Sequence, residues 1–148
     1  TVIFTATGDC RGTWDETRLY QLLSNLVENA IRHGDTEKPV KVEAVGKADE
    51  VQIAVHNEGA LIPQSEMRRI FEPMKQAEDG SSRAEGLGLG LYIARAIATA
   101  HHGAIDVEST KERGTTFTVR LPHHARAVVA ERRRVQSGRR LSDGQLPA

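Results

Sequence analysis

The sequence lacks several features that would define whole classes of protein. Its 148 residues include one cysteine, Cys10, so neither an internal disulfide nor a multi-cysteine metal site can form, and a reducing cytoplasm is the expected compartment. No apolar run approaches the roughly 18 residues that suggest a membrane span, and the N-terminus has no signal-peptide pattern. Lys plus Arg equal Asp plus Glu at 20 each. No overall charge therefore draws the chain to nucleic acid or to a membrane.

The composition that is present, 39% hydrophobic and 27% charged, is typical of a soluble globular protein. Residues 1–122 predict one domain. Residues 123–148 hold six arginines and predict a basic, flexible tail. The first residue is Thr1 and the chain opens within a strand-like pattern, so we expect a domain of a longer protein. The six histidines show no HExxH spacing, which favours helix-end or surface positions over metal ligation.

Hydrophobic periodicity predicts an alternation of strands and helices. Asp15 is a candidate N-cap and Gly34 a candidate C-terminal stop for the first long helix. Residues 74–86 have no periodicity and predict a mobile loop. The expected strands are 2–7, 40–46, 50–56, 103–109 and 115–121, and the expected helices are 15–33, 65–71 and 88–101.

A glycine-rich run precedes the last of these helices: Gly86-Leu87-Gly88-Leu89-Gly90-Leu91. Glycine lets a phosphate approach the main chain, and a helix N-terminus favours negative charge. The run matches neither a P-loop nor a strand–GxGxxG–helix dinucleotide motif. By itself it also fits a tight connection without a ligand.

A polar stripe lies on the first long helix. On a helical wheel Asn25, Asn29 and Arg32 fall opposite the leucine-rich face. Asparagine is a mediocre helix former, amide oxygens are hard ligands that suit Mg²⁺, and guanidinium pairs with phosphate. The stripe therefore favours a metal-bound polyphosphate, although a solvated polar face is the simple alternative.

Two further polar positions stand at strand ends. Asn57 ends a strand and Gly59 follows, an arrangement that can present an acceptor to a ligand amine or form an ordinary Asx-turn. Thr115 opens the closing strand on the same face as Phe117, Val119 and Leu121, so it can face a pocket.

Together these segments resemble the ATP-binding catalytic domain of bacterial sensor histidine kinases, of the superfamily that includes DNA gyrase, a heat-shock chaperone and a mismatch-repair ATPase. The resemblance covers roughly residues 1–122. With the order of elements, it predicts an α/β two-layer sandwich of the Bergerat type, with about five strands in a mixed sheet packed on three helices. The matching motifs are an asparagine box at 25–33, glycine boxes at 57–63 and 86–91, a phenylalanine box at 70–73 and a closing-strand box at 114–117.

The resemblance implies roles for individual residues. Asn29 would coordinate Mg²⁺ with Asn25 on the same stripe, and Arg32 and His33 would lie near the phosphates. Asn57 would accept from the adenine amino group, and its oxygen can do so without adding charge. The remaining expected nucleotide contacts are Gly59, Ile62, Lys75, Arg83, Gly86, Leu87, Gly88, Leu89, Gly90, Leu91 and Thr115.

The chain departs from the family at four positions. Asn57 replaces the usual Asp, Leu61 replaces the second glycine of its box, Met74 replaces a Phe, and Gln76 replaces an arginine whose charge Lys75 or Arg83 would supply. The Asn-x-Gly pattern followed by Ile-Pro resembles bacteriophytochrome-like kinases.

The resemblance implies that the chain binds ATP with Mg²⁺ and transfers the γ-phosphoryl group to a histidine on a dimerising helical hairpin, which passes it to a response regulator. No histidine here has that hairpin setting, so the chain alone is not expected to autophosphorylate. No nucleic-acid partner is expected, and the cytoplasmic parent could be soluble or membrane-anchored.

Two alternatives remain open. An anti-sigma-factor serine kinase shares this fold and size, although Ala100-His101-His102-Gly103-Ala104-Ile105 resembles the sensor-kinase turn. Asn57, Leu61 and Gln76 also fit a nucleotide-binding module without transferase activity.

Overall fold

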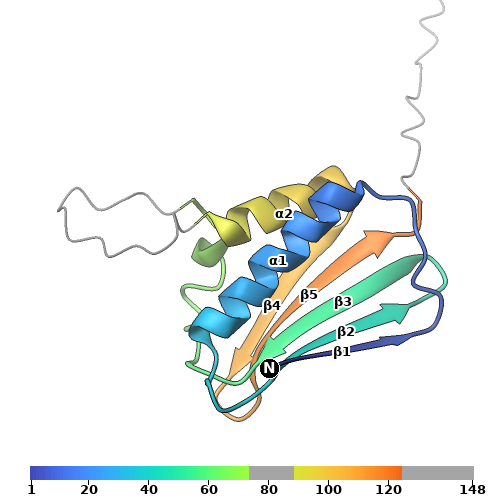
Figure 1. Cartoon of the computed structure of the whole chain (residues 1–148). Helices are drawn as coiled ribbons and strands as arrows, with labels where there is room; N and C mark the ends of the chain where they lie inside the picture. The colour runs from blue at the N-terminus through green and yellow to red at the C-terminus, as the bar shows by residue number, and fades with distance from the viewer. Residues whose placement is uncertain (74–88, 125–148) are drawn as a thin grey trace, which may run out of the picture.

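The computed structural model describes residues 1–73 and 89–124, which form one mixed sheet with helices packed on it (Figure 1). The strand order is β1-β2-β3-β5-β4. β1 runs parallel to β2, and every other neighbouring pair is antiparallel. The elements are β1 (Val2–Thr7), α1 (Glu16–His33), β2 (Val40–Gly46), β3 (Glu50–Asn57), the 3₁₀-helix η1 (Arg69–Phe71), α2 (Gly90–Ala100), β4 (Ala104–Thr110) and β5 (Gly114–Pro122).

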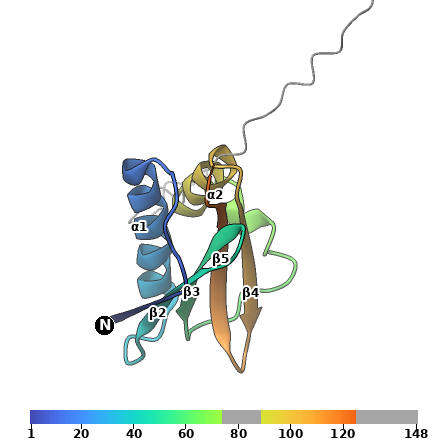
Figure 2. The ribbon, with the colours of Figure 1, turned by 90° about the vertical axis from the view of Figure 1, so that its right-hand side faces the viewer.

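The sequence predicted all five strands to within two residues, and the expected two-layer α/β sandwich is confirmed. Alternation along β3 and β5 places every second side chain against the helices and the others on the open face. Figure 2 shows α1 standing on one side of the sheet. The core between the layers is built mainly from aliphatic residues, with Leu22, Leu26, Val55, Phe117 and Val119 at 0% exposed area.

The ends of α1 lie where the sequence predicted, but the role of the glycine differs. The Asp15 side chain accepts from the backbone N–H of Arg18 at 3.0 Å, as an N-cap does. Gly34 is the C-cap with φ −81°, so no left-handed conformation requires glycine there. A Cβ at Gly34 would instead lie 2.5 Å from the carbonyl oxygen of Ala30 and 3.3 Å from Asn57 Cβ. Glycine is required at this position because the backbone of Ala30 and the side chain of Asn57 leave no room for a Cβ.

The predicted helix over residues 65–71 is only partly correct. Turns occupy most of the segment, and only Arg69–Phe71 is helical, as a 3₁₀-helix. The backbone N–H of Arg69 bonds to Glu66 and that of Glu72 bonds to Arg69, a three-residue spacing that closes tight turns. Phe71 still reaches the core, where its ring meets that of Phe117 edge-on at 6.1 Å. The segment is therefore anchored on the core by Phe71, with Ile70 packing beside it.

No helix within the described ranges is long and apolar enough to cross a membrane. The expected loop over residues 74–86 and all but His123 and His124 of the expected tail lie outside those ranges.

Candidate functional site

Asn25 of α1 lies at the contact with α2, which corrects the helical-wheel placement of this residue opposite the core. Asn25 and Asn29 are half-buried, whereas Arg32 and His33 are exposed. A Cβ built on Gly90, the first residue of α2, would lie 3.7 Å from Asn25 Cβ and Cγ. A helical wheel identifies the apolar face that packs on the sheet, but it does not show where a neighbouring helix lies. The sequence therefore could not predict the contact of Asn25 with α2.

Asn25 has an unusual environment. Its side-chain nitrogen Nδ2 is buried and has no hydrogen-bond partner among the described residues. A buried amide without a partner costs roughly 1–3 kcal/mol, and such groups are rare in folded proteins. The donor therefore marks a place where a ligand acceptor would be favourable.

The N-terminus of α2 provides further donors beside Asn25. Leu89 precedes the helix and makes no side-chain cap hydrogen bond. The first-turn N–H groups of a helix have no partners within the helix, and they attract anions together with the helix dipole. Leu91 follows Gly90 and packs partly against the core. Of the glycine run, Gly86, Leu87 and Gly88 lie outside the described residues, as do Lys75 and Arg83.

A second polar group lies at the end of the sheet where β3 finishes. Asn57 faces Thr115 in the β3–β5 register, and Thr115 faces Ser109 in the β4–β5 register. These three side chains are the buried polar residues of the described ranges, at 3%, 3% and 9% exposure. The Ser109 and Thr115 hydroxyls are 2.8 Å apart, and the Ile62 backbone N–H donates to Ser109 Oγ at 3.0 Å. A row of groups able to bond a polar ligand edge thus crosses three strands.

Ser109 was missed by the sequence reasoning. The predicted hairpin of residues 103–109 and 115–121 already places Ser109 opposite Thr115 across a tight turn. The pairing of two hydroxyl side chains across the strands is a signal that could have identified Ser109.

Gly59 joins the two ends of the site. It forms an isolated antiparallel bridge with Gly34, so the loop after β3 is attached to the end of α1. A Cβ on Gly59 would collide with the carbonyl oxygen of His33 and would lie 3.2 Å from Asn57 Nδ2. The structure shows that this glycine makes room for the backbone at the end of α1, and its expected contact with a nucleotide remains a prediction.

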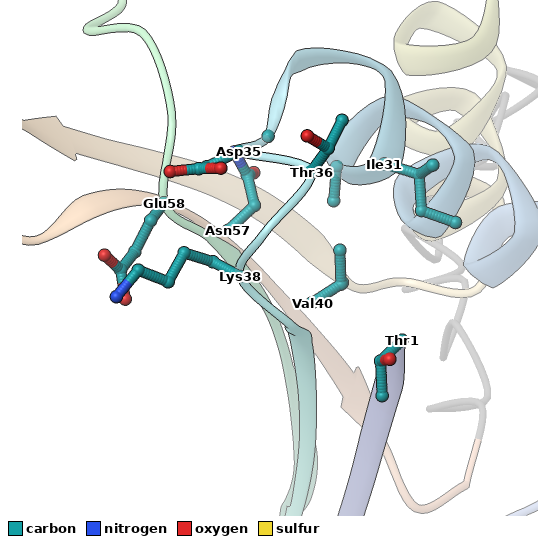
Figure 3. Close-up of a pocket in the computed structure, with 10 residues that line it drawn as sticks. Thr1, Ile31, Asp35, Thr36, Lys38, Val40, Asn57 and Glu58 are labelled. Carbon is teal, nitrogen blue, oxygen red and sulfur yellow. The ribbon is translucent and has the colours of Figure 1, made fainter.

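A small pocket of about 140 Å³ opens between the end of α1, Thr1, the start of β2 and the end of β3. Figure 3 shows Thr1, Ile31 and Val40 along it, with Asp35, Lys38 and Glu58 around Asn57. Ligand pockets are usually about 300–1,000 Å³, so this hollow is too small for a nucleotide. The donors at Asn25 and Gly90 are not among the residues that line it.

A known protein family matches most of the chain. The family model for histidine kinase-, DNA gyrase B-, and HSP90-like ATPases matches residues 14–125, and the chain belongs to this family. Its fold is that of the catalytic ATPase domain of histidine kinases.

Individual relatives agree with this assignment. A bacteriophytochrome of Pseudomonas aeruginosa is 40% identical over 113 residues, covering 76% of this chain and 15% of the relative. The signal transduction histidine-protein kinase AfsQ2 of Streptomyces coelicolor is 39% identical over 108 residues, covering 73% and 20%. The nucleotide-free catalytic domain of histidine kinase ThkA superposes with TM-score 0.71 at 31% identity, covering 83% and 80%. The chain thus spans about a fifth or less of the length of the bacteriophytochrome and of AfsQ2.

Proposed function

We propose that residues 1–122 form a domain that binds Mg·ATP between α1, α2 and the Asn57 end of the sheet, and that it transfers the γ-phosphoryl group to a histidine of its parent sensor kinase. The observation that carries this proposal is the buried, unpartnered Asn25 Nδ2 beside the uncapped start of α2. A phosphate oxygen there would accept from Asn25 and from first-turn backbone N–H groups.

The phosphate end of the proposed site also includes Asn29, Arg32 and His33. The described residues contain no cluster of three or more His, Cys, Asp or Glu side chains that could hold a metal ion. That fits Mg²⁺, which usually keeps several waters and binds through substrate phosphates and one or two protein oxygens. Asn29 would supply such an oxygen. When bound, the ion neutralises charge on the phosphates. Lys75, Arg83 and residues 86–88 remain predicted phosphate contacts.

The base end of the proposed site is the polar row at the end of the sheet. Asn57 Oδ1 would accept from the adenine amino group, and Thr115 would support that contact from the neighbouring strand. Gly59 and Ile62 would shape the loop over the base, since the Ile62 N–H is tied to Ser109. Leu89 and Leu91 would flank the phosphates at the start of α2.

The proposed reaction transfers a phosphoryl group between ATP and an imidazole. A nitrogen of the acceptor histidine forms a bond to the γ-phosphorus as the bond to the β,γ-bridging oxygen breaks, and ADP leaves. Catalysis by this domain would be mainly positioning and charge stabilisation. The acceptor would lie on a helical hairpin outside residues 1–148, and a response regulator would receive the group next.

The experiment that tests the transfer mixes this chain with a separate hairpin of the parent and with labelled ATP. We expect acid-labile, base-stable label on the hairpin histidine, formed slowly because the two parts are not tethered. The chain incubated alone should remain unlabelled. Label on serine of an added protein would support an anti-sigma-factor kinase instead, and ATP binding without transfer would support a nucleotide-binding module.

The Asn25→Leu variant tests the observation itself. Leucine is close to asparagine in shape and removes the unsatisfied amide, so thermal unfolding of the nucleotide-free chain should occur at an equal or higher temperature. Affinity for Mg·ATP, measured by calorimetry, should fall about tenfold because a charge-assisted hydrogen bond is lost. A lower unfolding temperature with unchanged affinity would make Asn25 a packing residue.

A further inference from the structure

The edge strand β1 exposes apolar side chains on both faces. It pairs only with β2, so its outer row of backbone groups has no neighbouring strand among the described residues. Phe4, Val2 and Ile3 are 64%, 47% and 45% exposed. Phe4 and Val2 are in register with Val42 and Val40, so they share the helix-facing side of the sheet. Yet α1 packs on β2 and β3 and leaves them uncovered.

The two edges of the sheet differ in charge. The opposite edge, β4, carries Asp106 and Glu108, both exposed, and Asp106 pairs with Arg120. Charged side chains on an edge strand discourage the addition of another strand. Val2–Thr7 carries no charge at all. A long, uncharged, apolar edge favours pairing with a further strand.

We propose that β1 pairs antiparallel with β1 of a second copy of this chain, about a two-fold axis perpendicular to the sheet. Such an axis keeps both helix layers on the same side of the joined sheet. Two residues that face each other must then point to the same side, so both have even numbers or both have odd numbers and their numbers add to an even sum. The sum of eight pairs Val2–Ala6 of one copy with the same residues of the other and sets Thr7 opposite Thr1. Phe4 then meets Phe4 of the second copy on the axis, Val2 meets Ala6, and Ile3 meets Thr5.

The chemistry of the strand suits this occupant. An interface that repeats the same surface must contain no like charges opposite one another, and β1 has none. The flank of α1 that includes Ile31 is uncharged over the four residues Tyr20, Ser24, Val27 and Ile31, spaced four, three and four residues apart, and Glu16 lies one turn before them. Ile31 and Thr1 line one pocket, which places this flank beside β1 (Figure 3). The pairing is independent of nucleotide binding.

Sedimentation equilibrium over micromolar to near-millimolar concentrations tests the association. The average mass should rise from 16.2 kDa toward twice that value and no further. Phe4→Lys puts two ammonium groups opposite each other on the axis, and the dimer dissociation constant should rise at least about tenfold. The matched control is Tyr92→Lys on α2, which replaces another exposed aromatic residue and should leave the constant unchanged.

Disulfide trapping tests the register. In a Cys10→Ser background, the Phe4→Cys variant should form a disulfide-linked dimer on mild oxidation. The Cα atoms of directly opposed residues in an antiparallel pair lie about 4.5–5.5 Å apart, and the Cα atoms of a disulfide lie about 4.4–6.8 Å apart. The Ile3→Cys variant alone should form no disulfide-linked dimer. A mixture of the Ile3→Cys and Thr5→Cys variants should form one. The proposal would be overturned by a chain that stays monomeric, by the same loss of dimer affinity in the Phe4→Lys and Tyr92→Lys variants, or by association beyond a dimer.

Discussion

At the scale of single residues, the proposed site rests on three asparagines with different surroundings. Asn25 is half-buried against Gly90 and its buried Nδ2 donor is unused. Asn29 lies one turn further along the same helix, and Asn57 is buried in a polar row. A neutral amide can donate and accept, so each can serve a ligand without the cost of burying a charge. The proposed roles divide accordingly into phosphate donor, metal ligand and base acceptor.

Asn29→Ala separates the metal role from a structural one. We expect ATP affinity to fall about tenfold with Mg²⁺ present and much less in EDTA, because the lost contact is to the ion. Calorimetric titrations in the two conditions measure the difference. Glu28→Ala, on the exposed neighbouring position, is the matched control and should behave like the parent chain. An equal loss in both conditions would assign Asn29 to packing.

At the scale of elements, α1 and α2 are joined side by side and bring the two halves of the phosphate end together. Asn25 of α1 contacts the start of α2, and the backbone N–H of Asp15 donates to His101 Nε2 at the other end of α2 at 3.2 Å. His101 Nδ1 donates in turn to the Ile97 carbonyl at 2.8 Å. The start of α2 at Gly90 is thereby held against Asn25 by contacts at both ends of the helix.

Gly90→Ala should separate stability from binding. Its Cβ would make ordinary contacts of 3.7–3.8 Å with Asn25, so the fold accepts it. Alanine in place of glycine at a compatible backbone position stabilises by about 0.4–1 kcal/mol because the unfolded chain has less conformational entropy, so the unfolding temperature should rise. The added methyl group lies beside the Asn25 amide and should weaken Mg·ATP binding severalfold.

The matched control for that variant is Thr99→Ala on the exposed side of α2. It should also stabilise slightly through helix propensity while leaving nucleotide affinity unchanged. If Gly90→Ala binds Mg·ATP as the parent does, the start of α2 is not the phosphate site.

At the scale of the whole molecule, a histidine ties three segments together at the end of the sheet remote from Asn57. His123 Nδ1 bonds to the Arg11 carbonyl and Nε2 to the Lys47 carbonyl, both at 2.6 Å. Carbonyl oxygens only accept, so both ring nitrogens must carry a proton. These two bonds, first that to Lys47 and then that to Arg11, raise the pKa of His123, with Asp9 and Asp49 adding to the effect.

The stability of the chain should therefore depend on pH through His123. The folded pKa lies above the unfolded value of about 6.5, so the stabilisation is complete below about pH 6.5 and is lost as pH rises through the folded pKa. Unfolding temperatures should fall between pH 6 and 8 in the parent and much less in His123→Gln. The ring of His124 bonds to the Thr13 hydroxyl and to no backbone carbonyl of the described residues, so His124→Gln should retain the parent's pH dependence. An NMR titration giving His123 a pKa at or below 6.5 would contradict the prediction.

The sequence by itself determined the elements and most of the motifs. Period-two and helical patterns located five strands and two long helices, and Asp15 capped α1 as predicted, because these features depend on neighbours within a few residues. The helix predicted over residues 65–71 is mostly turns, because the packing of Ile70 and Phe71 against the core, which the local pattern does not show, contributes to its shape. The domain limits and the ligand roles of individual residues remain predictions.

Only the tertiary structure decided which of these residues meet. The contact of Asn25 with Gly90, the Gly34–Gly59 bridge and the row of Asn57, Thr115 and Ser109 join residues separated by 65, 25 and more than 50 positions. The uncovered β1 edge is likewise set by how far the helix layer extends over the sheet. Local patterns cannot carry this information, because it depends on the packing of elements that are distant in the chain.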